Sequence, residues 1–166
     1  MSQKTIVITG ASRGLGAGMA KTFAALGHRL GLCSRTEPIL PCSSEIHSQT
    51  LNVTDFQELD DFIQATHAKL GPIDLWINNA GLLGPIGPLR EVDHRSIKQH
   101  MDTNVLGLIY GSQLYVRHLH DQNHQGALIN ISSGAARGGY FGWTSYCASK
   151  AAVDNFTQAL ALEEKD

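Results

Sequence analysis

The chain has 166 residues, which is enough for one domain with a buried core. Its formal charge is −2 and charged residues make up 17%, so nothing indicates a basic surface for nucleic acid. There is no apolar run of membrane-spanning length and no charged-then-apolar leader, and the three cysteines show no metal-ligand spacing, so we expect a cytoplasmic protein with reduced thiols and no metal site.

Apolar or β-branched runs alternate with amphipathic segments along the chain. Strands are expected at 4–9, 28–33, 50–53, 73–77 and 127–132, and helices near 13–26, 55–70, 93–120 and from 144 onward. Gly27 and Gly71-Pro72 are expected to end the first two helices. Two prolines limit residues 35–48 to at most a stub of helix. Strands separated by helices of this length predict an α/β fold with a doubly wound parallel sheet.

A glycine cluster directly follows the first expected strand, Thr5–Thr9. A strand, a glycine turn and a helix in this order are typical of dinucleotide binding. Gly10 would allow the tight turn, Gly14 would let the backbone approach a pyrophosphate, and Gly16 would permit close helix–strand packing. The helix N-terminus would supply free N–H groups for phosphate. The alternative is an ordinary turn whose glycines serve geometry alone.

Tyr146 and Lys150 stand four residues apart in the last expected helix, and Ser133 lies thirteen residues before the tyrosine. On a helix this spacing places two side chains on one face, with Cβ atoms about 5–6 Å apart. A neighbouring cation favours the phenolate form of a tyrosine, which suits an acid/base catalyst. Ser133 would hold a substrate carbonyl by its oxygen. The tyrosine–lysine spacing alone also occurs on plain surface helices.

These motifs resemble the classical short-chain dehydrogenase/reductase family. The glycine turn of that family, Thr-Gly-x-x-x-Gly-x-Gly, matches Thr9 to Gly16, and four further family motifs follow in order: Asn78-Asn79-Ala80-Gly81, Asn104-Val105-x-Gly107, Ile131-Ser132-Ser133 and Tyr146-x-x-x-Lys150. The run 142–164, with Gly-Trp and Tyr-Cys before a Leu-Glu-Glu helix end, resembles the sepiapterin reductase and benzil reductase branch. The resemblance implies a Rossmann-type, three-layer α/β/α fold in a single domain, residues 1–166.

The resemblance also implies roles for the matched residues. The expected catalytic residues are Ser133 and Tyr146 at the substrate carbonyl, Lys150 beside the tyrosine, and Asn104 holding a water of a proton relay. Ser132 is expected to be structural. The expected cofactor-binding residues are Thr9, Gly10, Ser12, Arg13, Gly14, Leu15, Gly16, Ser34, Arg35, Asn52, Val53, Asn79, Ala80, Gly81, Tyr146 and Lys150. Asn78 is expected to line the adenine–ribose side together with Ala80 and Gly81.

The identity of the cofactor follows from charge. Dehydrogenases that prefer NAD place an acid at the end of the second strand, where it bonds the ribose 2′-hydroxyl. Here that stretch reads Leu32-Cys33-Ser34-Arg35, without an acid. Arg13 and Arg35 instead suit a 2′-phosphate, although either one alone is also compatible with a solvated surface residue. The sequence therefore predicts NADP(H).

The expected function is an NADPH-dependent reductase of small ketones or diketones, assembled as a homodimer or homotetramer through the helices near 93–120 and 144–165. The chain is shorter than family members usually are, so we expect it to lack the C-terminal strands and the substrate segment, which would leave 127–132 as a sheet edge. Two alternatives stay open: a non-catalytic NADP-binding fragment and a redox-sensing Rossmann protein. A sugar-nucleotide epimerase is disfavoured by the glycine spacing.

Overall fold

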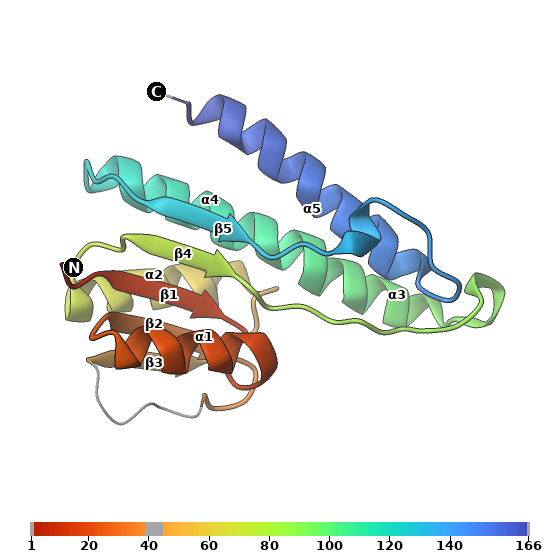
Figure 1. Cartoon of the computed structure of the whole chain (residues 1–166), viewed down its shortest axis with the longest axis horizontal. Coiled ribbons are helices and arrows are strands. Elements are labelled where there is room, and N and C mark those ends of the chain that lie inside the picture. The colour runs from red at the N-terminus through yellow and green to blue at the C-terminus, as the bar shows by residue number, and fades with distance from the viewer. Residues whose placement is uncertain (1, 39–44, 166) are drawn as a thin grey trace.

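The computed structural model describes residues 2–38 and 45–165 (Figure 1). Its parallel sheet has the strand order β3-β2-β1-β4-β5, formed by β1 (Thr5–Thr9), β2 (Arg29–Ser34), β3 (Ile46–Thr50), β4 (Leu75–Asn78) and β5 (Ala127–Asn130). The α-helices are α1 (Gly14–Ala25), α2 (Phe56–Leu70), α3 (His94–Met101), α4 (Gly107–Asp121) and α5 (Thr144–Glu163). Three short helical turns are η1 (Leu89–Glu91), η2 (Asp102–Leu106) and η3 (Gly134–Ala136). The expected doubly wound α/β fold is confirmed.

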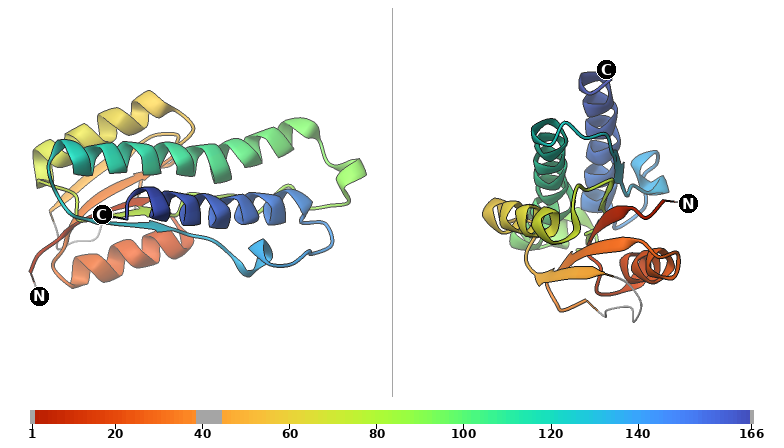
Figure 2. Two further views of the ribbon diagram at one scale, coloured as in Figure 1. Left: turned by 90° about the horizontal axis from the view of Figure 1, so that it is seen from above. Right: turned by 90° about the vertical axis from the view of Figure 1, so that its left-hand side faces the viewer.

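The two faces of β1 divide the core into two halves. Ile6 and Ile8 pack with Ala20 of α1 on one face, and Val7 packs with Phe62 of α2 and with α4 residues on the other. Successive residues of a strand point to opposite faces, so the continuous apolar run of β1 places side chains in both halves of the core. Seen along the sheet in Figure 2, α1 lies on one side and α2 and α4 lie on the other, which gives the expected three layers.

The third strand differs from the expectation. It was expected at 50–53 but runs from Ile46 to Thr50, and it pairs with β2 from Leu30↔Ile46 to Ser34↔Thr50. Leu51 and Val53, whose apolar character suggested the strand, lie in the following turn and are buried in the core. Of the expected helix stub at 35–48, residues 39–44 lie outside the described part of the chain, and the described remainder contains no helix.

The helix expected at 93–120 is interrupted by a wider turn. α3 and α4 are joined without a break by η2, a π-helical segment. Such segments are rare and often occur at functional sites. Because η2 changes the helical register, it determines where the side chain of Asn104 points. Within residues 2–38 and 45–165, no helix has both the length and the apolar character needed to cross a bilayer.

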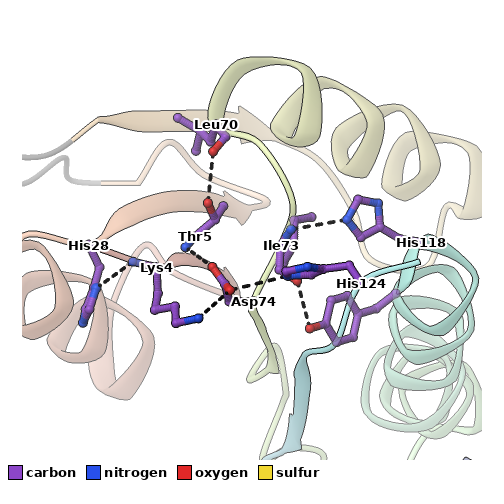
Figure 3. A network of polar contacts seen from close by, with 9 residues as sticks. Lys4, Thr5, His28, Leu70, Ile73, Asp74, His118 and His124 are labelled. Atoms are coloured by element: carbon purple, nitrogen blue, oxygen red, sulfur yellow. Dashed lines mark hydrogen bonds and ion pairs between the residues drawn. The ribbon is translucent and has the colours of Figure 1, made fainter. Parts of the chain in front are cut away.

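A polar network joins the amino ends of the strands, opposite the glycine turn (Figure 3). Asp74 accepts hydrogen bonds from the Thr5 amide, at 2.8 Å, and from Lys4 Nζ, at 2.9 Å. Burial raises the pKa of Asp74, but these bonds outweigh burial and hold the pKa below its usual value. Nearby, Nε2 of the buried His118 accepts from the Ile73 amide at 3.3 Å. The network ties α4 and β1 to the segment that leads into β4.

Candidate active site

A cleft of about 570 Å³ lies at the carboxyl ends of the strands, where parallel sheets of this kind bind ligands. It is lined by twelve of the expected cofactor-binding residues: Gly10, Ser12, Arg13, Gly14, Leu15, Ser34, Arg35, Asn52, Val53, Asn79, Ala80 and Gly81. Thr36 and Thr103 also line it, and sequence reasoning missed both. Each follows or precedes a residue that was singled out, so extending the motifs by one position would have found them.

The three glycines of the turn have different tasks. Gly10 has a φ of +67°, and a Cβ there would lie 2.8 Å from Ala80 Cα. A Cβ on Gly16 would lie 2.3 Å from the Gly10 carbonyl oxygen, so Gly16 serves close packing and does not line the cleft. Gly14 has a φ of +57° and open space around it, which leaves its backbone accessible from the cleft. The turn is shaped for the close approach of a ligand to the main chain.

Thr9 and Asn79 brace this turn against the end of β4. Thr9 Oγ1 accepts from the amides of Asn79, at 3.0 Å, and Ala80, at 3.1 Å. The side-chain Nδ2 of Asn79 in turn donates to the carbonyl oxygens of Thr9, at 2.9 Å, and Gly10, at 3.2 Å. Thr9 is buried and does not line the cleft, so its contribution is to hold the turn in place.

The charges around the cleft fit a phosphorylated dinucleotide. No described side chain caps the N-terminus of α1 and its first turn contains no acid, whereas Asp55 caps α2. Free N–H groups at a helix N-terminus bind phosphate. Arg13 and Arg35 line the cleft, and no carboxylate from the described residues does. The residues present therefore fit the phosphate groups of a nicotinamide dinucleotide.

Tyr146 and Lys150 meet on one face of α5, as their spacing predicts. Lys150 Nζ lies 5.7 Å from the centre of the Tyr146 ring. The lysine is 7% exposed, and its Nζ donates to the Ile131 carbonyl oxygen at 2.7 Å. Burial lowers the pKa of Lys150, and the charge of Asp154 partly opposes that shift. The bond to Ile131 anchors the ammonium group at the carboxyl end of β5.

Ser133 and Ser132 occupy different environments. Ser133 is partly exposed and caps η3, which packs against α5. Its Oγ accepts from the Ala135 amide at 3.2 Å, so its own hydrogen is available for another partner. Ser132 Oγ is buried and has no hydrogen-bond partner among the described residues. Of the two hydroxyls, Ser133 has the one suited to a substrate.

Asn104 is 1% exposed, in η2. Its Oδ1 accepts from the Leu82 amide at 2.7 Å, and its Nδ2 donates to the Leu82 carbonyl oxygen at 2.8 Å. The side chain thus fixes the loop that follows β4. A relay water would have to bond another atom of this turn.

Asn78 does not line the cofactor side, contrary to the expectation. Its side chain points toward α4, where Oδ1 accepts from Trp76 Nε1 at 2.8 Å and Nδ2 donates to Ser112 Oγ and Asn130 Oδ1, each at 2.9 Å. Neighbouring residues of a strand face opposite sides, so Asn79 faces the glycine turn and Asn78 faces the core. Asn78 is a buried structural residue.

His100, which sequence reasoning did not single out, lies beside Asn104 and the Tyr146 ring. It is 0% exposed and contacts Gly84, Asn104 and Ser149 through its two ring nitrogens. The only signal in the sequence is its place one helical turn before Asn104, which does not by itself distinguish it from the other seven histidines.

Comparisons with known proteins agree with this geometry. A family model described as short chain dehydrogenase matches residues 4–166. Benzil reductase ((S)-benzoin forming) of Bacillus subtilis (strain 168) is 32% identical over 168 residues, which cover 96% of this chain and 67% of that protein. NADPH-dependent pterin aldehyde reductase of Arabidopsis thaliana is 31% identical over 170 residues, which cover 98% of this chain and 70% of the relative.

A crystal structure of NADH-dependent reductase A1-R′ complexed with NAD superimposes with a TM-score of 0.87 at 26% identity, covering 99% of this chain and 74% of that one. This chain spans about two-thirds of the length of the two curated relatives. The match of the family model over nearly the whole chain agrees with the order of the five motifs. The chain belongs to the classical short-chain dehydrogenase/reductase family of nicotinamide-dependent oxidoreductases, with benzil and pterin aldehyde reductases among its relatives.

Proposed function

We propose that this chain is the catalytic core of an NADP(H)-dependent reductase of ketones or diketones, in which Tyr146 is the proton donor. The observation that carries the proposal is the contact between Lys150 and Tyr146 on α5. Neither residue lines the cleft, but Lys150 Nζ is bound to the Ile131 carbonyl oxygen at the carboxyl end of β5, the end of the sheet at which the cleft lies. An ammonium group held beside this tyrosine favours the phenolate form, as an acid/base catalyst requires.

The preference for NADP(H) is supported by the charges of the cleft. Arg13 and Arg35 line it without a carboxylate from the described residues, and Asn52 stands in it as a neutral side chain. A 2′-phosphate is recognised well by arginine because the guanidinium group can donate two parallel hydrogen bonds. The relatives point both ways, since one is named NADPH-dependent and another was crystallised with NAD.

Each residue of the site then has a task in reduction. When bound, the nicotinamide supplies the hydride that reduces the carbonyl carbon. Ser133 donates its free hydrogen to the carbonyl oxygen, and Tyr146 donates the proton that this oxygen takes up. Lys150, anchored by Ile131, keeps a positive charge beside the tyrosine as its proton leaves. Asn104 keeps the loop after β4 in place.

An aromatic wall next to Tyr146 supports apolar carbonyl substrates. The Trp143 ring lies edge-on to the Tyr146 ring at 5.6 Å, and Tyr140 lies against Trp143 at 5.4 Å. Aromatic rings favour flat or apolar partners through stacking and edge contacts. One of the relatives is named for benzil, a diaryl diketone.

NADPH oxidation, assayed over diketones, simple ketones and pterins, tests the proposal. The wild type should turn over at least one of these substrates, and Tyr146→Phe should lower kcat by roughly 100-fold or more with an unchanged Kd for NADPH, because only the proton donor is lost. Tyr110→Phe, on the neighbouring helix α4, is the matched control and should behave like the wild type. Full turnover by Tyr146→Phe would contradict the role of the tyrosine. Saturable NADPH binding with no turnover would instead favour a cofactor-binding module.

Assembly and location complete the proposal. We infer one domain over residues 1–166 that works in the cytoplasm as a homodimer or homotetramer. Leu106 in η2 and Leu162 in α5 are 41% and 70% exposed, which supports contacts through the long helices. Sedimentation equilibrium tests the assembly, and a monomer at all concentrations would refute it.

A further inference from the structure

His100 contacts three segments: the loop after β4, the adjoining π-helical turn η2, and α5. Its Nδ1 bonds the carbonyl oxygen of Gly84, in the loop after β4. A carbonyl oxygen only accepts, so Nδ1 carries the hydrogen. Nε2 lies 3.0 Å from Ser149 Oγ on α5 and 3.1 Å from Asn104 Nδ2 in η2. In this tautomer Nε2 is an acceptor, and the ring bridges the loop, the π-helical turn and α5.

The side chains around the His100 ring have enough donor hydrogens and acceptors to satisfy one another. Asn104 Nδ2 uses one hydrogen for the Leu82 carbonyl oxygen at 2.8 Å, which leaves the other for Nε2. Ser149 Oγ has one hydrogen, which lies within reach of both Nε2, at 3.0 Å, and the carbonyl oxygen of Tyr146, at 2.9 Å. The same Oγ is an acceptor for Asn104 Nδ2 at 3.3 Å. Every hydrogen of this buried unit therefore has an acceptor, and such satisfied networks hold their members in one arrangement.

The unit touches both halves of the candidate site. On one side, Ser149 directly precedes Lys150, and the His100 ring meets the Tyr146 ring at 6.1 Å and 74°. On the other side, Asn104 Oδ1 would lie 3.5 Å from a Cβ on Gly81, a residue that lines the cofactor cleft. His100 thus stands between the helical turn that carries the tyrosine–lysine pair and the wall of the cleft.

We propose that His100 is a positioning residue: acting through Ser149 and Asn104, it fixes the Tyr146–Lys150 turn relative to the wall of the cofactor cleft. This inference rests on the proposed function. A misplacement of about 1 Å at a reacting group can lower a rate by roughly 100-fold. A residue that sets the position of Tyr146 relative to the bound cofactor therefore acts on kcat more than on cofactor binding.

Three substitutions separate the two ring nitrogens. His100→Asn retains a donor near Nδ1, His100→Gln retains an acceptor oxygen near Nε2, and His100→Leu retains neither. His94→Gln, on the same helix α3 with its side chain 88% exposed, is the matched control. Assays are run at a temperature at which circular dichroism shows every variant to be folded, with Kd for NADPH measured alongside.

We expect His100→Leu to lower kcat by roughly 10- to 100-fold while Kd for NADPH stays within about twofold, with partial recovery in the Asn or the Gln variant. Unchanged kcat in a folded His100→Leu would overturn the positioning role and leave the proposed function intact. A parallel loss of kcat and NADPH binding in all three variants would also overturn it, because a merely structural residue would act that way.

Hydrogen exchange provides a readout that needs no turnover. Amides of the loop 81–85 and of the first turns of α5 should exchange faster together in His100→Leu and remain slow in His94→Gln. A wild type without turnover would refute the proposed function and the catalytic consequence drawn from it. Unchanged exchange in His100→Leu would separately refute the coupling of the two segments.

Discussion

Replacing Arg35 by alanine should weaken the binding of NADPH far more than that of NADH. Arg35 directly follows β2, is exposed, and lines the cleft together with Arg13. A 2′-phosphate placed between these side chains would accept charge-assisted hydrogen bonds from both. NADH lacks that phosphate, so it should be nearly indifferent to the change.

The size of the effect follows from the exposure of Arg35. A hydrogen bond to a charged group contributes about 1.5–3 kcal/mol, and solvent and salt reduce it for exposed pairs. We therefore expect a loss of about 1–2 kcal/mol, which corresponds to a roughly 5- to 30-fold higher Kd for NADPH. The loss should shrink as the salt concentration rises, because exposed charges are screened.

Titration of both cofactors against the wild type, Arg35→Ala and Arg90→Ala measures the effect. Arg90 is a suitable control because its side chain is 80% exposed and pairs with Glu91 in η1. Equal weakening of NADPH and NADH by Arg35→Ala would show that the arginine does not read the 2′-phosphate. A wild type that binds NADH more tightly than NADPH would refute the reasoning altogether.

Two further predictions concern the scaffold. Burial, followed by the charges of neighbouring histidines, lowers the pKa of His118 from 6.5, so below that pH the unfolded chain binds more protons than the folded one. Tm should therefore decrease as the pH is lowered from about 7.5 to about 5. His118→Gln can still accept from the Ile73 amide and should make Tm depend less on pH. An equally steep decrease of Tm in the variant would exclude His118 as a cause. Gly16→Ala would place a Cβ 2.3 Å from a backbone oxygen of the glycine turn and should cost about 1–3 kcal/mol in urea unfolding. A Cβ on Gly18 would meet open space, so Gly18→Ala is the control and should not destabilise the helix. Equal stability of the two variants would contradict the packing role of Gly16.

Much of the site could be predicted because its motifs are local. The turn from Gly10 to Gly16 joins one strand to the helix that follows it, so its shape depends on few other residues. Tyr146 and Lys150 meet because a helix places residues four apart on one face. The cleft residues follow from the same logic, since the carboxyl ends of parallel strands lie at one edge of the sheet.

Other features required the tertiary structure. The alternation of β4 is too short to reveal whether Asn78 or Asn79 faces the cleft, and only the position of α4 shows that Asn78 is enclosed. The register of β3 depends on its pairing with β2, which local composition does not encode. The bridging position of His100 arises only when the loop after β4, η2 and α5 come together.

By itself, the sequence determined the family, the order of strands and helices and the chemistry available at the strand ends. These features depend on motifs whose residues are only a few positions apart. The tertiary structure alone decided which polar side chains are enclosed and which face the cleft. Burial and hydrogen-bond partners depend on residues that are distant in the chain, and hydrophobic periodicity indicates a face of an element but not what covers it.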